Sequence, residues 1–241
     1  MSRKRAIWSV GLLLLVSTSA LATYRYDTLA CSFVDLSGFV EIEKNVYVSP
    51  DTGFEDREEL LSLLAHAKTR VIATYGQYSA TPIIISGRHI NSLRIFGSDE
   101  YASTKFLPWR SCIVLGPKGH SVDIVAHELV HSEIFEVLGY WARTFRVPIW
   151  FEEGAAMQVD YRTRYDATDI NTRGLTVSEL RYSWQFFRGD DDELTRHYAG
   201  AKSEVSCWVS KVSHKGIFVL LNRIKQGESF DDTYKAMYEE S

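Results

Sequence analysis

The sequence predicts an α+β fold, in which a small N-terminal sheet lobe precedes a mostly helical C-terminal lobe. In residues 23–120, short apolar runs of strand length surround one segment with helical periodicity. In residues 121–241, apolar side chains recur mainly every three or four positions, which is typical of helices that bury one face. The sequence shows no internal repeat, low-complexity tract or linker. We therefore expect residues 23–241 to form one domain built from these two lobes.

The N-terminus has the pattern of a targeting segment. A basic start at residues 3–5 is followed by an apolar run at residues 6–16 and an A-x-A exit at residues 20–22. This pattern predicts a secretory signal peptide, residues 1–22, and an exported protein, periplasmic or secreted. An uncleaved membrane anchor is the alternative, although the apolar run is short for a full span. Lipid attachment at Cys31 fits less well, because Cys31 lies far from the apolar run.

The charge of the chain argues against one class of partner. Removal of residues 1–22 lowers Lys+Arg from 27 to 24 against 31 acidic residues, which gives the mature chain a net charge of −7. Such a chain does not attract nucleic acid through its overall field, so we expect no nucleic-acid partner. We expect membrane contact only if the N-terminal segment is not cleaved.

The three cysteines, Cys31, Cys112 and Cys207, are an odd number for an exported chain. One disulfide and one remaining thiol are therefore expected, and Cys112–Cys207 is the pairing we favour. The spacing of the cysteines does not suggest a metal site.

Three strands and one helix are predicted for the N-terminal lobe. The strands are residues 38–50, 81–86 and 111–115. The helix is residues 56–75, with Leu60, Leu64, Ala67 and Val71 in one stripe and Gly76 at its end. Residues 23–37 are expected to be a loosely ordered lead-in, and residues 87–110 an irregular segment or hairpin.

The motif with the most chemical content lies in residues 121–139, a helix-periodic run with Ser121 as N-cap and Gly139 just past its end. It contains His127-Glu128-Leu129-Val130-His131, an H-E-x-x-H pattern. Residues four apart lie on one helix face, so both imidazoles can bind one metal ion while Glu128 faces a water bound to it. Buried without a metal or hydrogen-bond partners, these groups would be costly.

A second predicted helix, residues 147–160, supplies a carboxylate. Pro148 suits a first helical position. Glu153 is followed by two small residues that allow close helix packing, and it is our candidate third ligand. Glu152 is the competing ligand, but Glu153 stands just before glycine. Met157 is expected to pack in the core beneath the site.

HELVH followed by WFEEGAA resembles the gluzincin (peptidase MA-like) metallopeptidases, especially the aminopeptidase-type branch with its W-x-x-E-G element. The resemblance implies that His127, His131 and Glu153 bind one zinc ion and that Glu128 is the catalytic base. It also implies a zincin-like order, with the H-E-x-x-H helix between a sheet lobe and a helical lobe. The 21 residues between His131 and Glu153 exceed the commonest spacing, so the loop between the helices is expected to be longer.

The resemblance extends more loosely to residues 197–238. Tyr198 in the run Y-A-G-A resembles the tyrosine of the aminopeptidase branch, which implies a role in stabilising the oxyanion; a packing tyrosine is the alternative. His197 is a second candidate proton donor, or else a solvated histidine. In family members the strand before the metal helix is an edge strand that pairs with substrate, which would assign residues 112–115 to that role.

The remaining polar residues are expected to have structural or surface positions instead of functional ones. Asp160 could orient a metal-binding histidine, but we expect it to be exposed. Glu133 and Glu136 are expected on the solvent face. The run GDDDE at residues 189–193 could bind calcium, but we favour a solvated turn or a helix start. The isolated histidines are expected to be structural or superficial: His66, His89, His120 and His214.

Residues 162–173 are predicted to be a loop, and residues 177–187 have helical character. Three further helices are predicted in the C-terminal lobe. They are residues 192–213, 216–224 and 230–239, the last with Ser229 as N-cap.

These observations predict an exported zinc metallopeptidase that hydrolyses a peptide or protein substrate, with one zinc per chain. A zinc-bound envelope binding or assembly factor without turnover is one alternative, and a zinc hydrolase of a non-peptide amide is another. Glu128 argues against the binding factor, which needs no general base. The strand SCIVLG lacks the G-x-M-E-N-like sequence that binds the free amine in aminopeptidases. This absence favours endopeptidase activity or cleavage from the carboxyl side.

Overall fold

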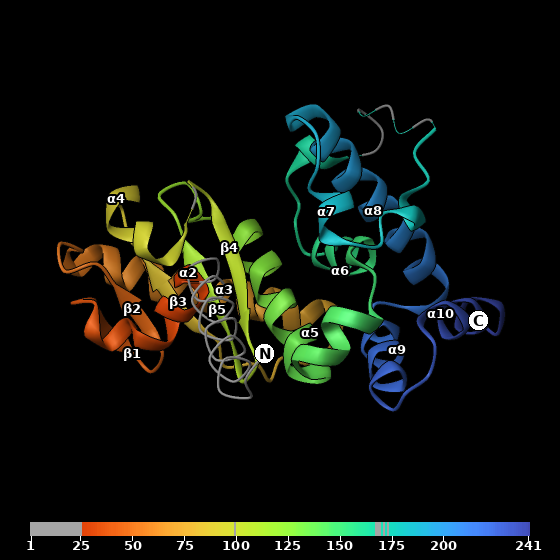
Figure 1. The fold of residues 1–241 in the computed structure, drawn as a ribbon, viewed down its shortest axis with the longest axis horizontal. Helices are drawn as coiled ribbons and strands as arrows, with labels where there is room; N and C mark the ends of the chain where they lie inside the picture. The colour runs from red at the N-terminus through yellow and green to blue at the C-terminus, as the bar shows by residue number, and fades with distance from the viewer. Residues whose placement is uncertain (1–25, 99, 167–169, 171, 173) are drawn as a thin grey trace, which may run out of the picture.

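A computed structural model describes residues 26–98, 100–166, 170, 172 and 174–241. The predicted signal peptide, its cleavage site and the alternative anchor lie outside these residues. Within the described residues, no helix is both long and apolar enough to cross a membrane. The fold is α+β, as predicted. Figure 1 shows the sheet on one side, helix α5 in the middle and helices α6 to α10 on the other side.

The sheet has five strands in the order β1-β2-β3-β5-β4. The strands are β1 (Val40–Glu43), β2 (Val46–Val48), β3 (Ile83–Ser86), β4 (Ala102–Leu107) and β5 (Arg110–Leu115). The three middle strands are parallel, and β1 and β4 pair antiparallel at the two edges. The single strand predicted over residues 38–50 is therefore wrong. Asn45, with φ of 66°, turns that segment into a hairpin, because this left-handed conformation cannot continue a strand.

The position of β5 corrects a second expectation. Residues 112–115 were expected to form an edge strand, but β5 pairs with β3 on one side and with β4 on the other. Residues 87–110, expected to be an irregular segment or a hairpin, supply β4, which pairs with β5 and takes the edge position. At this edge of the sheet, the outer backbone groups of β4 have no partner strand and can pair with an added one.

The helices reproduce most of the predicted segments. They are α2 (Tyr26–Ala30), α3 (Phe54–Tyr75), α4 (Ile90–Leu93), α5 (Val122–Arg146), α6 (Ile149–Ala156), α7 (Ser183–Phe186), α8 (Asp191–Val212), α9 (Lys215–Lys225) and α10 (Phe230–Glu239). Short 3₁₀ turns lie at Cys31–Leu36, Arg94–Phe96, Thr163–Tyr165 and Val177–Glu179. The predicted lead-in thus contains α2 and a 3₁₀ turn. Gly139, with φ of 73° and ψ of 169°, ends the regular part of α5, and residues 140–146 continue after this kink.

Both faces of the sheet are covered, which explains why its inner strands are continuously apolar. On β3, Ile84 faces the large core shared with α3 and α5, whereas Ile83 and Ile85 face a smaller core. Cys31 and Cys112 meet in that smaller core and form a disulfide. The favoured pairing Cys112–Cys207 is therefore wrong. Cys207 lies on α8 in the helical lobe and is a free, exposed thiol.

Glu133 corrects another expectation, because it is completely buried. Its carboxylate accepts hydrogen bonds from the Ser79 and Ala80 amides at 2.7 and 2.8 Å, and from the Gln77 side chain at 3.0 Å. These donors belong to the loop between α3 and β3, so the carboxylate replaces the water that the loop would otherwise need. Glu136, further along α5, is exposed, as expected.

Close packing between α6 and α8 fixes the position of Glu153. A Cβ atom added to Gly154 would lie 2.4 Å from the Ala201 carbonyl oxygen and 2.6 Å from a Val205 methyl group. Tyr75 of α3 secures the other side of α6 by donating a 2.5 Å hydrogen bond to the Ala155 carbonyl. The small residue next to Glu153 thus permits the close helix approach that the sequence predicted.

Gly154→Ala is expected to lower the free energy of unfolding by about 1–2 kcal/mol. Overpacking costs about 1–3 kcal/mol, and the better helix propensity of alanine offsets up to about 1 kcal/mol. Chemical denaturation measures this change. Gly200→Ala on α8 is the matched control, because its Cβ would meet the movable end of the Leu175 side chain instead of backbone. Equal stability of the two variants would contradict this account of the α6–α8 contact.

Candidate metal centre and active site

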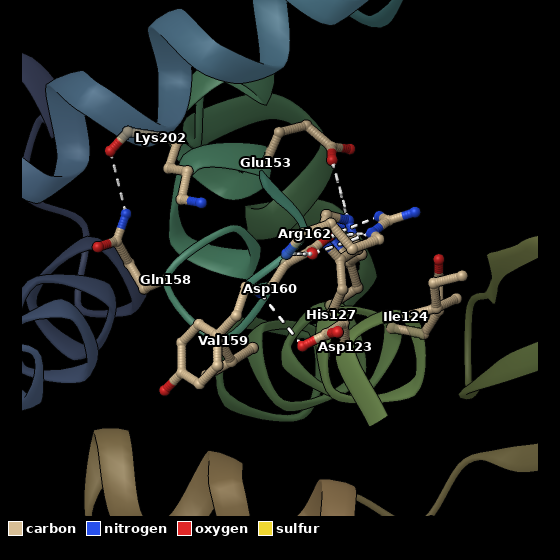
Figure 2. Close-up of polar contacts among 12 residues, drawn as sticks. Asp123, Ile124, His127, Glu153, Gln158, Val159, Asp160, Arg162 and Lys202 are labelled. Atoms are coloured by element: carbon tan, nitrogen blue, oxygen red, sulfur yellow. Dashed lines mark hydrogen bonds and ion pairs between the residues drawn. The ribbon is translucent and has the colours of Figure 1, made fainter. Parts of the chain in front are cut away.

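Three ligand atoms converge between α5 and α6. The Nε2 atoms of His127 and His131 are 3.1 Å apart, and Glu153 Oε2 lies 3.4 and 3.5 Å from them. In Figure 2, Glu153 extends from α6 toward His127 on α5. Metal–ligand bonds of 2.0–2.1 Å in a tetrahedron place neighbouring ligand atoms roughly 3.3 Å apart. The three distances match this edge length.

The chemistry of this group also fits a metal ion. His127, His131 and Glu153 are buried, and Glu153 Oε2 has no hydrogen-bond partner among the described atoms. Burial alone lowers the pKa of His131, but the neighbouring Glu153 and Glu152 carboxylates raise it to about 10. The two carboxylates thus favour a positive charge at this point. The His127–His131–Glu153 group could hold a metal ion, as the sequence predicted.

Glu152, the competing ligand, points to the opposite side of the His131 ring. Its Oε1 atom lies 2.8 Å from His131 Nδ1 and accepts hydrogen bonds from Arg143 Nε and Nη2 at 2.9 and 2.6 Å. Burial would raise the pKa of Glu152, but Arg143 and His131 keep it below its usual value. An ionised carboxylate at Nδ1 leaves Nε2 free to face a metal. Sequence reasoning did not assign this orienting role to Glu152, or any role to Arg143.

Asp160 is completely buried, so the expectation that it is exposed is wrong. Its Oδ2 atom lies 3.8 Å from His127 Nδ1, and Arg162 binds both carboxylate oxygens, at 2.5–3.0 Å. Two tethers hold this segment. Gln158 donates a hydrogen bond to the Lys202 carbonyl at 3.1 Å (Figure 2), and the Tyr161 amide donates one to Asp123 at 3.2 Å. Asp160 thus lies on the Nδ1 side of His127, but at 3.8 Å it does not form the hydrogen bond that Glu152 forms with His131, and His127 Nδ1 has no hydrogen-bond partner among the described atoms.

Glu128 lies beside the metal-binding group and contacts the edge strand. Its Oε2 atom accepts a 2.6 Å hydrogen bond from Thr104 Oγ1 on β4. Glu128 is not among the three converging ligands, which agrees with its predicted role as a base instead of a ligand. Thr104 was not predicted from sequence. The run ASTKFL of β4 has no regular alternation of polar and apolar residues, so no local pattern marks Thr104 as a strand residue that faces Glu128.

Tyr198 of α8 comes to the same site. Its ring centroid lies 6.2 Å from that of His127, and its ring packs against Tyr165 and Phe186. Burial, together with the Glu153 and Glu128 carboxylates, raises the pKa of Tyr198 well above its usual value. The phenol therefore stays protonated and can donate a hydrogen bond.

His197 lies away from this group. Its Nδ1 atom is 2.7 Å from the Phe186 carbonyl, and the side chain is buried. It is neither placed as a second proton donor nor solvated, which corrects both interpretations offered from sequence.

A cleft passes along both sides of Glu128. Two cavities, of about 310 and 530 Å³, share Ala102, His127, Glu128, Leu194 and Tyr198 as lining residues. Strand β4 runs from one cavity to the other, since Ala102 lines both and Phe106 lines the larger. An extended chain paired with the free edge of β4 would therefore pass the converging side chains.

The other sequence candidates lie outside this group. His120 contacts Ser86 Oγ at 2.8 Å, and the Tyr75 ring packs against His214. The acidic run at residues 189–193 starts a helix, as favoured: Asp190 caps α8 by accepting a 2.9 Å hydrogen bond from the Glu193 amide. Met157 is fully buried, as expected.

No protein-family model, curated protein or solved structure matches this chain. The functional assignment therefore rests on the residues and their geometry.

Proposed function

We propose that this chain is an exported zinc metallopeptidase of gluzincin type that hydrolyses peptide bonds in an extended substrate. The observation that carries the proposal is the convergence of His127, His131 and Glu153 beside a carboxylate, Glu128, that is not itself one of the converging ligands. The zincin-like order of the lobes supports it, because α5 lies between the sheet and the C-terminal helices (Figure 1). Residues 1–22 support export.

Zinc is the metal we propose, because two imidazoles and one carboxylate at these distances suit tetrahedral coordination with one open position. When bound, zinc would supply Lewis acidity and lower the pKa of a coordinated water. Glu152 would orient the His131 imidazole through its contact with Nδ1, and the Asp160 carboxylate would favour a proton on the nearby Nδ1 of His127 through its charge.

Glu128 would act as the general base and then as the general acid. Its carboxylate would take a proton from water and deliver it to the leaving amine. The hydrogen bond from Thr104 holds Oε2 in place, which leaves Oε1 to exchange protons. The position of Thr104 on β4 links this carboxylate to the strand that would hold the substrate.

Tyr198 would stabilise the negative charge that develops on the carbonyl oxygen. Its neutral phenol lines both cavities and can donate a hydrogen bond at that point. The free edge of β4 would bind the substrate backbone as an added strand. β4 would thus take the role that the resemblance implies for residues 112–115.

Removal of the metal tests the proposal. Dialysis of the mature protein against a zinc chelator is expected to abolish hydrolysis of a mixed peptide library, and one equivalent of zinc is expected to restore it. Mass spectrometry of the released fragments measures both effects and locates the cleaved bonds. Hydrolysis that survives complete zinc removal, or no hydrolysis by the zinc-loaded protein, would favour the binding-factor alternative.

A further inference from the structure

The two cavities beside Glu128 differ in the side chains that line them. The smaller one is lined by two guanidinium groups, Arg162 and Arg164, which lie 5.0 and 4.9 Å from the centroid of the Tyr165 ring. The larger one is lined by the aromatic and apolar side chains of Phe106, Tyr140, Ile149 and Phe187. Arg143 also lines the larger cavity, so the two ends of the cleft differ in which arginine is available to a ligand.

The two arginines of the smaller cavity differ in their availability. Arg162 is committed to the buried Asp160 by paired hydrogen bonds. Arg164 instead contacts Asp191 at 3.3 Å and the Thr195 hydroxyl at 3.1 Å. The side chains of Arg164 and Asp191 are 42% and 85% exposed, and ion pairs this exposed contribute little free energy. An incoming carboxylate could therefore replace Asp191 at small cost.

The cation of the larger cavity is not available in the same way. The Arg143 guanidinium is bound to the buried Glu152 and lies 3.4 Å from the Phe106 ring centroid. Its charge is neutralised and covered, so this end of the cleft suits an apolar side chain. The difference between the two ends follows from the partners of Arg143 and Arg164.

From this asymmetry, and resting on the proposed function, we propose that the smaller cavity is a specificity subsite in which Arg164 binds a substrate carboxylate. An apolar side chain on the other side of the scissile bond would occupy the larger cavity. The carboxylate can belong to a glutamate or aspartate side chain or to the C-terminus of the peptide. Both sources place a planar anion against a guanidinium.

Equilibrium binding tests this subsite without requiring turnover. One pair of fluorescently labelled peptides contains a single Phe, and its two members differ only in having Glu or Gln at a nearby position, tested on either side of the Phe. Each peptide is titrated with zinc-loaded Glu128→Gln protein, and the fluorescence anisotropy is measured. A second pair of peptides differs only in a free or amidated C-terminus. We expect about fivefold tighter binding of the charged member of at least one pair, and a smaller preference at higher salt. The pair that responds identifies the source of the carboxylate.

To measure the dependence on Arg164, the double variant Glu128→Gln/Arg164→Gln is compared with Glu128→Gln. Both proteins carry the same substitution at residue 128, so they differ only at Arg164. The preference is expected to fall to less than twofold. Arg188→Gln is the matched control, because Arg188 lines a separate cavity, and it should keep the preference. Equal binding of both members of every pair, absence of binding, or an unchanged preference in Arg164→Gln overturns the subsite. Its failure is distinguishable from failure of the proposed function, which chelator-sensitive hydrolysis by the native protein tests separately.

Discussion

Glu128→Gln is expected to reduce peptide hydrolysis at least ~10²-fold, the low end of the usual contribution of a general base. Zinc content and melting temperature are expected to stay close to those of the native protein. The amide oxygen of Gln can still accept the hydrogen bond that Thr104 gives to Glu128, so the contact with β4 survives. The amide cannot take up the proton that a carboxylate accepts, so only the chemical step is affected.

Tyr198→Phe provides the comparison for this effect. It removes one hydrogen-bond donor from the site and leaves the metal-binding group and the ring packing against Phe186 in place. We expect it to fold normally and to lose less activity than Glu128→Gln. Rates are measured on one peptide, with zinc content determined on the same samples. If Glu128→Gln hydrolyses that peptide as fast as the native protein, the mechanism proposed here is wrong.

Local sequence patterns were sufficient for the helices and for the metal-binding group. His127 and His131 are one helical turn apart, so helix geometry alone brings their side chains to one face. Glu153 could be preferred over Glu152 because it adjoins Gly154, which the structure shows pressed against α8. These predictions needed no knowledge of which distant segments meet.

Predictions failed where they depended on distant segments. Glu133 was placed on the solvent face because its partners, the loop residues Ser79 and Ala80, lie more than fifty positions earlier in the chain. Cys31 could not be paired with Cys112 before the sheet order was known, since the disulfide joins residues 81 positions apart. The edge position that the resemblance implies for β5 fails for the same reason, since the antiparallel pairing of β4 against it has no strong local signal.

The arrangement of Glu152 and Glu153 leads to the other large expected effect. His127→Ala, His131→Ala and Glu153→Ala are each expected to lose zinc on gel filtration, because each removes one of three ligands. Glu152→Ala is expected to retain zinc at saturating concentration, although its affinity falls by about 10–100-fold because His131 loses its orienting partner. Alanine substitutions of these two neighbouring, buried carboxylates should thus have different effects on zinc binding.

Zinc titration with a competing chromophoric chelator measures these affinities, and circular dichroism of each variant confirms that it is folded. Glu152→Gln is the matched control for Glu152→Ala, because its amide oxygen can still accept a hydrogen bond from His131 Nδ1. We expect it to recover part of the lost affinity, whereas Glu153→Gln should not, since a neutral amide is a poor substitute for a carboxylate ligand. Zinc retained by Glu153→Ala but lost by Glu152→Ala would reverse the two assignments and require a site built on the Nδ1 side of His131.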